Sequence, residues 1–166
     1  LTTTVSITVN NTGTVNAQSG MLALSGGGTS TGSFTSASGK TLEFGGGTHD
    51  LNSGATVPGL GTVGESAGTG NVNTGASWTV TGPTEITGGT LNFNSGATAT
   101  LATVTQSAGT LGGTGSMSAS GLYTWSAGTM TAAGITNANG GMALSGVGTK
   151  TLVTNRILNN NAATAT

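Results

Sequence analysis

The sequence has little of what most proteins use to build a core or a reactive site. It has no cysteine, one histidine and two prolines, and aromatic residues make up 4% of its 166 positions. The absence of cysteine excludes disulfides and thiolate metal sites. Three basic and four acidic residues give a net charge of −1, so no basic patch is available to bind a phosphate backbone. No apolar run reaches the roughly 18 residues that span a bilayer, and no basic amphipathic helix is visible. We therefore expect neither nucleic acid nor a membrane as a partner.

The residues that are abundant are small. Glycine occupies 32 positions and hydrophobic residues only 34%, too few large side chains for a compact globular core. Disorder is one interpretation of such a composition. Against it, large apolar residues recur in register, the charge is low for a solvated coil, and proline is present only at Pro58 and Pro83. A repetitive ordered fold accounts for these observations better.

The stretch 88–101 is the clearest copy of a repeat that recurs about every twenty residues. It predicts two short strands, 91–94 and 98–101, in which apolar and small polar residues alternate, with a bend at Ser95 and Gly96. Gly-Thr steps recur at spacings of 19, 21, 21, 20, 19 and 20, with their threonines at Thr29, Thr48, Thr69, Thr90, Thr110, Thr129 and Thr149. A second series consists of triplets with apolar residues at the first and third positions, which we call apolar triplets, at 22–24, 42–44, 78–80, 99–101, 123–125 and 142–144. Regular spacing of this kind is the signature of a solenoid.

We predict an all-β fold, a single-stranded parallel β-helix (β-solenoid) of about eight coils of about 20 residues. Stacked at about 4.8 Å per coil, it would be a rod about 40 Å long. Each coil needs only a few inward side chains, and asparagine, threonine and serine would form hydrogen-bonded ladders at the bends. The expected inward residues are Val72, Trp78, Val80, Ile86, Leu91, Phe93, Leu101, Val104, Leu111, Met117, Trp125, Met130, Ile135, Met142 and Leu144.

Residues 1–166 are expected to form a single solenoid segment, cut from a longer tandem array. The stretch 54–70 is the least regular and predicts a bulge or a longer loop. The segment 7–14 is echoed by 157–164, an offset of 150, which suggests the start of a second, larger unit. An uncapped last coil would stack on a following copy, because solenoids otherwise need caps to protect their edges.

Several phrases resemble the repeats of very large bacterial surface and secreted proteins. They lie at 88–93, 106–115, 122–130 and 150–152, and they are similar in style to autotransporter passengers and filamentous-haemagglutinin-like adhesins. The resemblance is one of repeat texture over most of the chain, and it brings no catalytic motif. It implies an extracellular, cell-surface β-helical stalk or adhesin segment.

The candidate reactive residues are few and scattered. His49 and Asp50 are adjacent, so on a strand they point to opposite faces and are expected to lie in a solvated turn rather than in a catalytic pair. A polysaccharide-cleaving site needs clustered acids, whereas Glu43, Glu65 and Glu85 are single and spread along the chain. Contacts across stacked coils, between Glu43 and Asp50 or between Glu65 and Glu85, remain an alternative. We expect no catalytic residue, no metal site and no cofactor.

Two surface alternatives remain open. Trp78, Tyr123 and Trp125 are weak candidates for sugar contact if their rings face outward, although core packing is the favoured interpretation. Thr-x-Thr pairs suggest an ice-binding face if they align, and they lie at 2–4, 12–14, 29–31, 79–81, 98–100 and 129–131.

The main hypothesis is a structural or adhesive extracellular rod that is not an enzyme. Its partners would be other copies or neighbouring repeats stacked end to end, and surface glycans. The alternatives are a carbohydrate-binding or polysaccharide-processing β-helix and, third, an ice-binding solenoid.

Overall fold

The computed structural model describes residues 1–153 and 155–162, and this part of the chain consists of short strands joined by tight corners, without helix. Every strand pair is parallel. Paired residues on successive coils are 18 to 23 positions apart. The prediction of an all-β parallel solenoid of about eight coils is confirmed.

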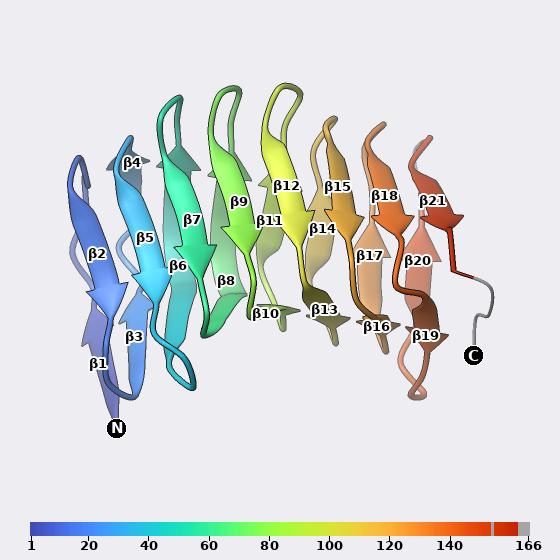
Figure 1. Ribbon diagram of the computed structural model, residues 1–166, viewed down its shortest axis with the longest axis horizontal. Coiled ribbons are helices and arrows are strands. Elements are labelled where there is room, and N and C mark those ends of the chain that lie inside the picture. The colour runs from blue at the N-terminus through green and yellow to red at the C-terminus, as the bar shows by residue number, and fades with distance from the viewer. Residues whose placement is uncertain (154, 163–166) are drawn as a thin grey trace.

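One face of the solenoid is an eight-stranded sheet to which each coil contributes one strand. In Figure 1 it forms the front row of arrows, which all point the same way. Its strands in spatial order are β2 (Thr14–Ala17), β5 (Ser33–Ser36), β7 (Thr56–Gly59), β9 (Ser77–Val80), β12 (Thr98–Leu101), β15 (Ser116–Ala119), β18 (Ile135–Ala138) and β21 (Ile157–Asn160).

The thirteen-stranded sheet makes the other two faces, which we call the first and second wings. Two long strands, β6 (Thr41–Leu51) and β8 (Thr62–Val72), run through both wings and join them. The first wing also holds β1 (Thr2–Val5), β3 (Met21–Leu24), β10 (Pro83–Ile86), β13 (Thr103–Gln106), β16 (Tyr123–Trp125) and β19 (Met142–Leu144). The second wing also holds β4 (Gly28–Ser30), β11 (Thr90–Phe93), β14 (Thr110–Gly112), β17 (Gly128–Met130) and β20 (Lys150–Leu152).

The core is a set of axial rows of inward side chains. Alternation along each strand places every second residue inside, as in the buried Leu91 and Phe93 of β11. Thirteen of the fifteen predicted inward residues are buried. Ile135 points outward because the inside–outside alternation along β18 is shifted by one residue from the predicted one, so Thr136 is buried instead. Leu144 continues the inward row of Trp125 but is 57% exposed, because it lies in the last described coil.

The Gly-Thr series is confirmed in the middle of the chain and wrong at its two ends. Thr48, Thr69, Thr90, Thr110 and Thr129 pair in sequence on the second wing. Thr29, however, pairs with Asp50, and Thr129 pairs with Thr151 instead of Thr149. The end coils differ in length from the central ones, so a constant spacing in sequence does not keep register there.

The apolar triplets and the terminal echo do not mark single structural positions. Triplets 22–24, 42–44, 123–125 and 142–144 lie on the first wing, whereas 78–80 and 99–101 lie on the eight-stranded sheet. All three faces alternate with the same period, so the pattern recurs on each. Similarly, 157–160 is β21, which continues the column of β2, whereas 7–9 is not a strand. Residues 163 and 164 of the echo lie outside the described residues.

Residues 54–70 contain β7 and most of β8. The pairing of β6 with β8 shifts register between Phe44 and Gly45 and again between Gly45 and Thr48. Within β7, Pro58 has no N–H to donate to the ladder. The Thr56 N–H donates to the Gly32 carbonyl oxygen at 3.2 Å, and the Leu60 N–H donates to the Ser36 carbonyl oxygen at 3.1 Å. Between these two bonds the ladder lacks one donor, at the position of Pro58.

Candidate functional site

The three candidate sugar-contact aromatics lie inside the core. Trp78 and Tyr123 are 0% exposed and Trp125 is 4% exposed. The Trp78 ring meets Phe93 edge to face at a centroid distance of 6.0 Å, and its Nε1 donates to Thr84 Oγ1 at 3.2 Å. None of the three offers a ring face to a sugar, and their burial is what the core-packing interpretation predicts.

Tyr123 is part of a polar brace across the core. Its hydroxyl donates to Gln106 Oε1 at 2.8 Å, and Gln106 Nε2 donates to the Thr129 carbonyl oxygen at 3.0 Å. These bonds link the first wing to the second. Burial raises the pKa of the Tyr123 phenol, so the group stays neutral and serves as a hydrogen-bond donor.

His49 and Asp50 lie near the C-terminal end of β6 and point to opposite faces, as predicted. The expected solvated turn is wrong for His49, which is 2% exposed and packs edge to face against Phe44 at 5.0 Å. Its Nε2 lies 3.1 Å from the Leu24 carbonyl oxygen, which can only accept, so Nε2 carries the proton. Burial lowers the pKa of the ring. Asp50 faces outward and accepts from Asn71 Nδ2 at 2.8 Å.

Glu65 is the most unusual side chain in the core. It is 0% exposed, and neither carboxyl oxygen has a hydrogen-bond partner in the structure. It occupies an inward row between Phe44 and Ile86. Gly70 leaves room for it, because a Cβ there would lie 2.7 Å from Glu65 Oε2. Burial, with a smaller contribution from the charge of Glu43, raises its pKa from 4.5 to about 9.

The acids do not assemble into a catalytic pair or a metal cluster. Glu43 and Glu85 lie in one outward column with Gly64 between them, whereas Glu65 points inward. The suggested contact of Glu43 with Asp50 does not form, because Asp50 is on the second wing. Glu65 and Glu85 lie on adjacent strands but point to opposite faces, so this pair does not place two carboxylates on one surface either. Among the described residues, no group of three or more His, Asp or Glu side chains could hold a metal ion.

Arg156 is a second buried side chain among the seven charged residues, after Glu65. Sequence reasoning missed its burial and treated it only as one of those charges. It is 6% exposed and lies under the last described coil. Its guanidinium donates to Thr136 Oγ1 at 2.9 Å and to the carbonyl oxygens of Gly112, Gly113 and Thr131 at 3.1 to 3.3 Å. Burial lowers its pKa. The partner Thr136 explains why β18 turns a threonine inward.

Strand phase is the signal that identifies Glu65 as a core residue. Val63 and Glu65 are two positions apart and therefore share a face, and Val63 is apolar. No comparable signal identifies Arg156, which lies in a corner between strands.

The predicted amide ladders at the bends are confirmed. Amide side chains on successive coils donate to one another at 2.8 to 2.9 Å. The central columns are Asp50, Asn71 and Asn92 on the second wing and Asn52, Asn73 and Asn94 at the following corner.

The Thr-x-Thr pairs are dispersed over the surface. Thr98 and Thr100 are exposed on the eight-stranded sheet, Thr2 and Thr4 are on the first wing, and Thr129 is on the second. The pairs therefore do not align into the one flat array that the ice-binding alternative needs. The longest aligned column of threonines, from Thr48 to Thr129, lies on the second wing, and shorter pairs such as Thr105 with Thr124 lie on the first.

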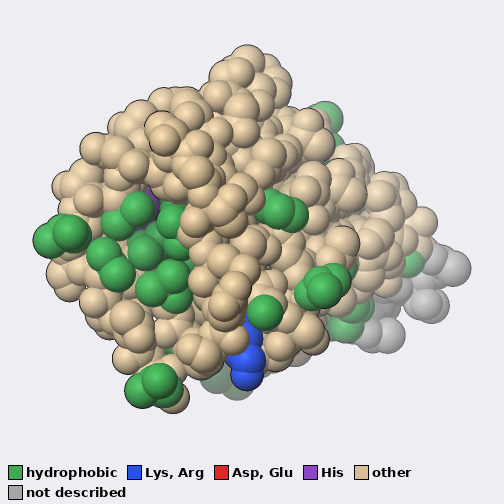
Figure 2. Space-filling view, turned by 60° about the vertical axis from the view of Figure 1, so that its left-hand side comes forward, with side chains coloured by type: hydrophobic (Ala, Val, Ile, Leu, Met, Phe, Trp, Pro, Cys, Tyr) green, Lys and Arg blue, Asp and Glu red, His purple; other side chains and the backbone are tan. Residues whose placement is uncertain are grey.

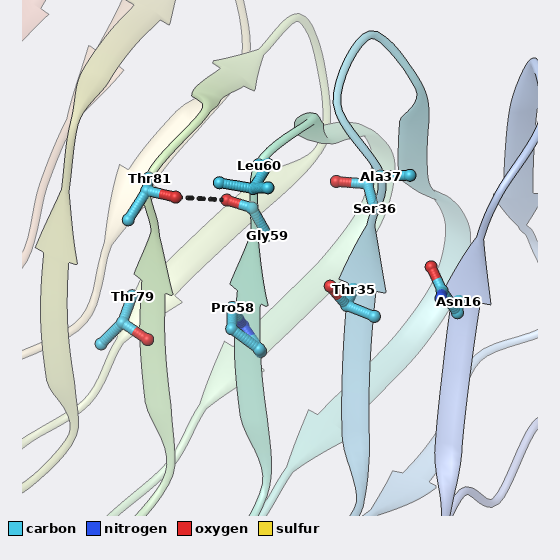
Figure 3. Close-up of a pocket in the computed structure, with 9 residues that line it drawn as sticks. All are labelled: Asn16, Thr35, Ser36, Ala37, Pro58, Gly59, Leu60, Thr79 and Thr81. Carbon is cyan, nitrogen blue, oxygen red and sulfur yellow. Dashed lines mark hydrogen bonds between the residues drawn. The ribbon is translucent and has the colours of Figure 1, made fainter.

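A shallow hollow of about 400 Å³ lies on the outer face of the eight-stranded sheet, around Pro58. Figure 3 shows Asn16, Thr35, Pro58 and Thr79 side by side on successive strands, with Leu60 at one edge. A second hollow of about 390 Å³ continues it across Thr100 and shares Thr79 and Thr81. Sequence reasoning placed no site here, because hydroxyl residues at strand positions are common.

Nothing in the described part of the chain forms a helix of the length and apolarity needed to cross a bilayer. Comparison of the chain with known proteins found no matching family model, no matching curated protein and no matching solved structure.

Proposed function

We propose that this chain is a segment of a structural or adhesive rod outside the bacterial cell, without catalysis of its own. The observation that carries the proposal is that both ends of the described coil stack expose apolar side chains to solvent. The bacterial and extracellular part of the proposal is supported by the repeat texture of the sequence.

The N-terminal end is apolar and uncovered. Figure 2, in which this end comes forward, shows hydrophobic side chains gathered there. Leu1 is 99% and Ile7 is 73% exposed, and Val5, Val9 and Val15 of the first coil are only partly buried. Apolar surface of this kind is favourable to cover.

The C-terminal end has the same character. The large hydrophobic residues exposed in the last described coil, apart from the outward-facing Ile157, are Leu144, Val147, Leu152 and Val153. The two ends also match in shape: β1 and β19 are the first and last strands of the first wing, and β2 and β21 are the first and last of the eight-stranded sheet. A further coil placed on either end would extend both sheets in the same direction.

The occupant we propose is another β-coil, from a neighbouring repeat or from a second copy of the chain. The contact is head to tail, so it does not close on itself and propagates along the axis. Backbone hydrogen bonds and apolar rows would then continue across the junction and give a stiff rod. Four percent charged residues leave little repulsion between rods that lie side by side.

Sedimentation velocity over a range of protein concentrations tests end-to-end stacking. We expect the chain to associate and Leu144→Lys to stay monomeric, because the lysine charge would lie in the apolar junction. Leu122→Lys is the matched control: Leu122 is 44% exposed, in the corner before β16, away from either end. A wild-type chain that remains monomeric, or equal association of the two variants, would contradict the proposal.

A further inference from the structure

The two hollows on the eight-stranded sheet form one groove that lies across the strands. They share Thr79 and Thr81, and their linings extend from Asn16 in β2 to the corner after β15. This run crosses six strands, so at about 4.8 Å per strand its length is about 24 Å. The groove therefore follows the axis of the rod.

The proline in β7 lies at the centre of the first hollow. Pro58 cannot donate the ladder hydrogen bond that would go to the Phe34 carbonyl oxygen of β5. Pairing of β5 with β7 is accordingly limited to Ser33 with Thr56, whereas β7 and β9 pair at four positions. The hollow lies over this place, on the outer face of β5, β7 and β9 (Figure 3).

The lining of the groove carries no charge and offers more apolar than polar surface. Neither hollow is lined by a Lys, Arg, Asp, Glu or His side chain. The Thr81 hydroxyl donates to the Gly59 carbonyl oxygen at 2.9 Å, while the hydroxyl and amide groups of Asn16, Thr35 and Thr79 have no side-chain partner among the residues drawn. These groups are available to a ligand that donates and accepts hydrogen bonds.

An apolar edge completes the lining, and a buried hydroxyl lies beneath it. Leu60 is 70% exposed beside the Pro58 ring, which gives the groove an apolar wall. Ser36 is 2% exposed and its Oγ has no hydrogen-bond partner in the structure. It is directed toward the gap at Gly59, where a Cβ would lie 3.0 Å from it. Ser36 shares the inward phase of Phe34 and its hydroxyl is enclosed, so it lies beneath the groove and does not face a ligand on the outer surface.

We propose that this groove binds a linear, uncharged polysaccharide that lies along the rod axis. Sugar rings combine hydroxyl groups with apolar C–H faces, and the groove offers unpaired hydroxyl and amide groups beside an apolar wall. The absence of charged lining residues disfavours acidic polysaccharides and phosphorylated ligands. The long axis of the groove requires a chain of several sugars and not a single one. This binding goes beyond the rod function and does not depend on end-to-end stacking.

The test is binding of the intact chain to defined oligosaccharides. The probes are hexamers of neutral β-linked glucose, mannose and xylose, with oligomers of alginate as the acidic comparison, followed by calorimetric titration. Thr79→Arg places a long charged side chain where the two hollows meet, and Leu60→Ser removes the apolar wall. Thr105→Arg is the matched control, on the exposed outer face of β13 in the first wing.

We expect at least one neutral hexamer to bind, Thr79→Arg to weaken its binding by about tenfold or more, and Thr105→Arg to leave it unchanged. Leu60→Ser should weaken it by a smaller factor. Circular dichroism of each variant establishes that the solenoid is intact, and both Thr79 and Leu60 are surface residues. The proposal is overturned if no neutral hexamer binds, if only alginate binds, or if Thr79→Arg and Thr105→Arg bind equally.

Discussion

Replacing Glu65 by methionine should stabilise this protein at neutral and alkaline pH. Glu65 is fully buried with both carboxyl oxygens unpartnered, and its pKa is raised to about 9. Between its unfolded value of 4.5 and this folded value, the native chain holds a proton that the unfolded chain has released. The free energy of unfolding therefore falls by about 1.4 kcal/mol for each pH unit through that range.

The window above pH 7 isolates this carboxyl from the histidine. The pKa of buried His49 is lowered from 6.5, so its contribution to stability is present above that value and is lost as the pH falls below it. Below about pH 6.5 the two groups thus have opposite effects. From about pH 7 to about pH 8.5 only Glu65 acts, and the wild-type chain should lose about 2 kcal/mol of unfolding free energy.

The methionine variant removes this loss and fills the same row between Phe44 and Ile86 with an apolar side chain of similar length. At pH 7 the linkage alone predicts a gain of about 3 kcal/mol. Urea unfolding followed by circular dichroism, at about pH 7 and about pH 8.5, measures both quantities. Glu85→Gln, on the outer face of β10, is the control and should retain the wild-type pH dependence.

Two results would refute the reasoning. One is a wild-type stability that stays constant or rises between pH 7 and pH 8.5. The other is a Glu65→Met variant that is less stable than wild type at pH 8.5 while Glu85→Gln behaves normally. Either result would mean that Glu65 is ionised and paired in the folded protein.

Three further substitutions test the core and the amide columns. Phe93→Ala, at a fully buried position, should lower the unfolding free energy by about 3–5 kcal/mol. Asp50→Asn keeps an acceptor for Asn71 on the outer face and should change the unfolding free energy by less than about 0.5 kcal/mol. Equal urea midpoints for the two variants would contradict the assignment of the inward rows. Asn73→Ala removes the hydrogen-bond donor to Asn52 and the acceptor of Asn94, and it should lower the unfolding free energy by about 1–3 kcal/mol. A urea midpoint equal to that of the wild type would show that this column does not contribute to stability.

The sequence alone was sufficient for the architecture. Alternation with a period of two, as in Leu91 and Phe93, and steps of about twenty residues, as from Thr48 to Thr69, together require short strands that stack on their equivalents. Both signals are local or strictly periodic, and so are the amide columns at the bends. Scarcity of large side chains is consistent with this fold, since each coil encloses only a few.

The sequence identified most of the inward positions, but only the tertiary structure decided which side faces the core in strands such as β18, where a polar residue lies inside. Phase depends on the length of each corner, and corners differ enough for paired residues to lie between 18 and 23 positions apart. A shift of one residue exchanges the inside for the outside. For this reason Ile135 was placed inside although it points outward and is half-buried, whereas Glu65 and His49 were missed because they are polar.

The groove is likewise a property of stacking and not of any one coil. Pro58 is visible in the sequence, but its effect depends on which strand lies beside it and which direction its missing N–H faces. Asn16, Thr35 and Thr79 are far apart in the chain and become neighbours only because their coils stack. Burial of Arg156 has the same origin, since its four partners belong to two earlier coils whose carbonyl groups converge only in the folded rod.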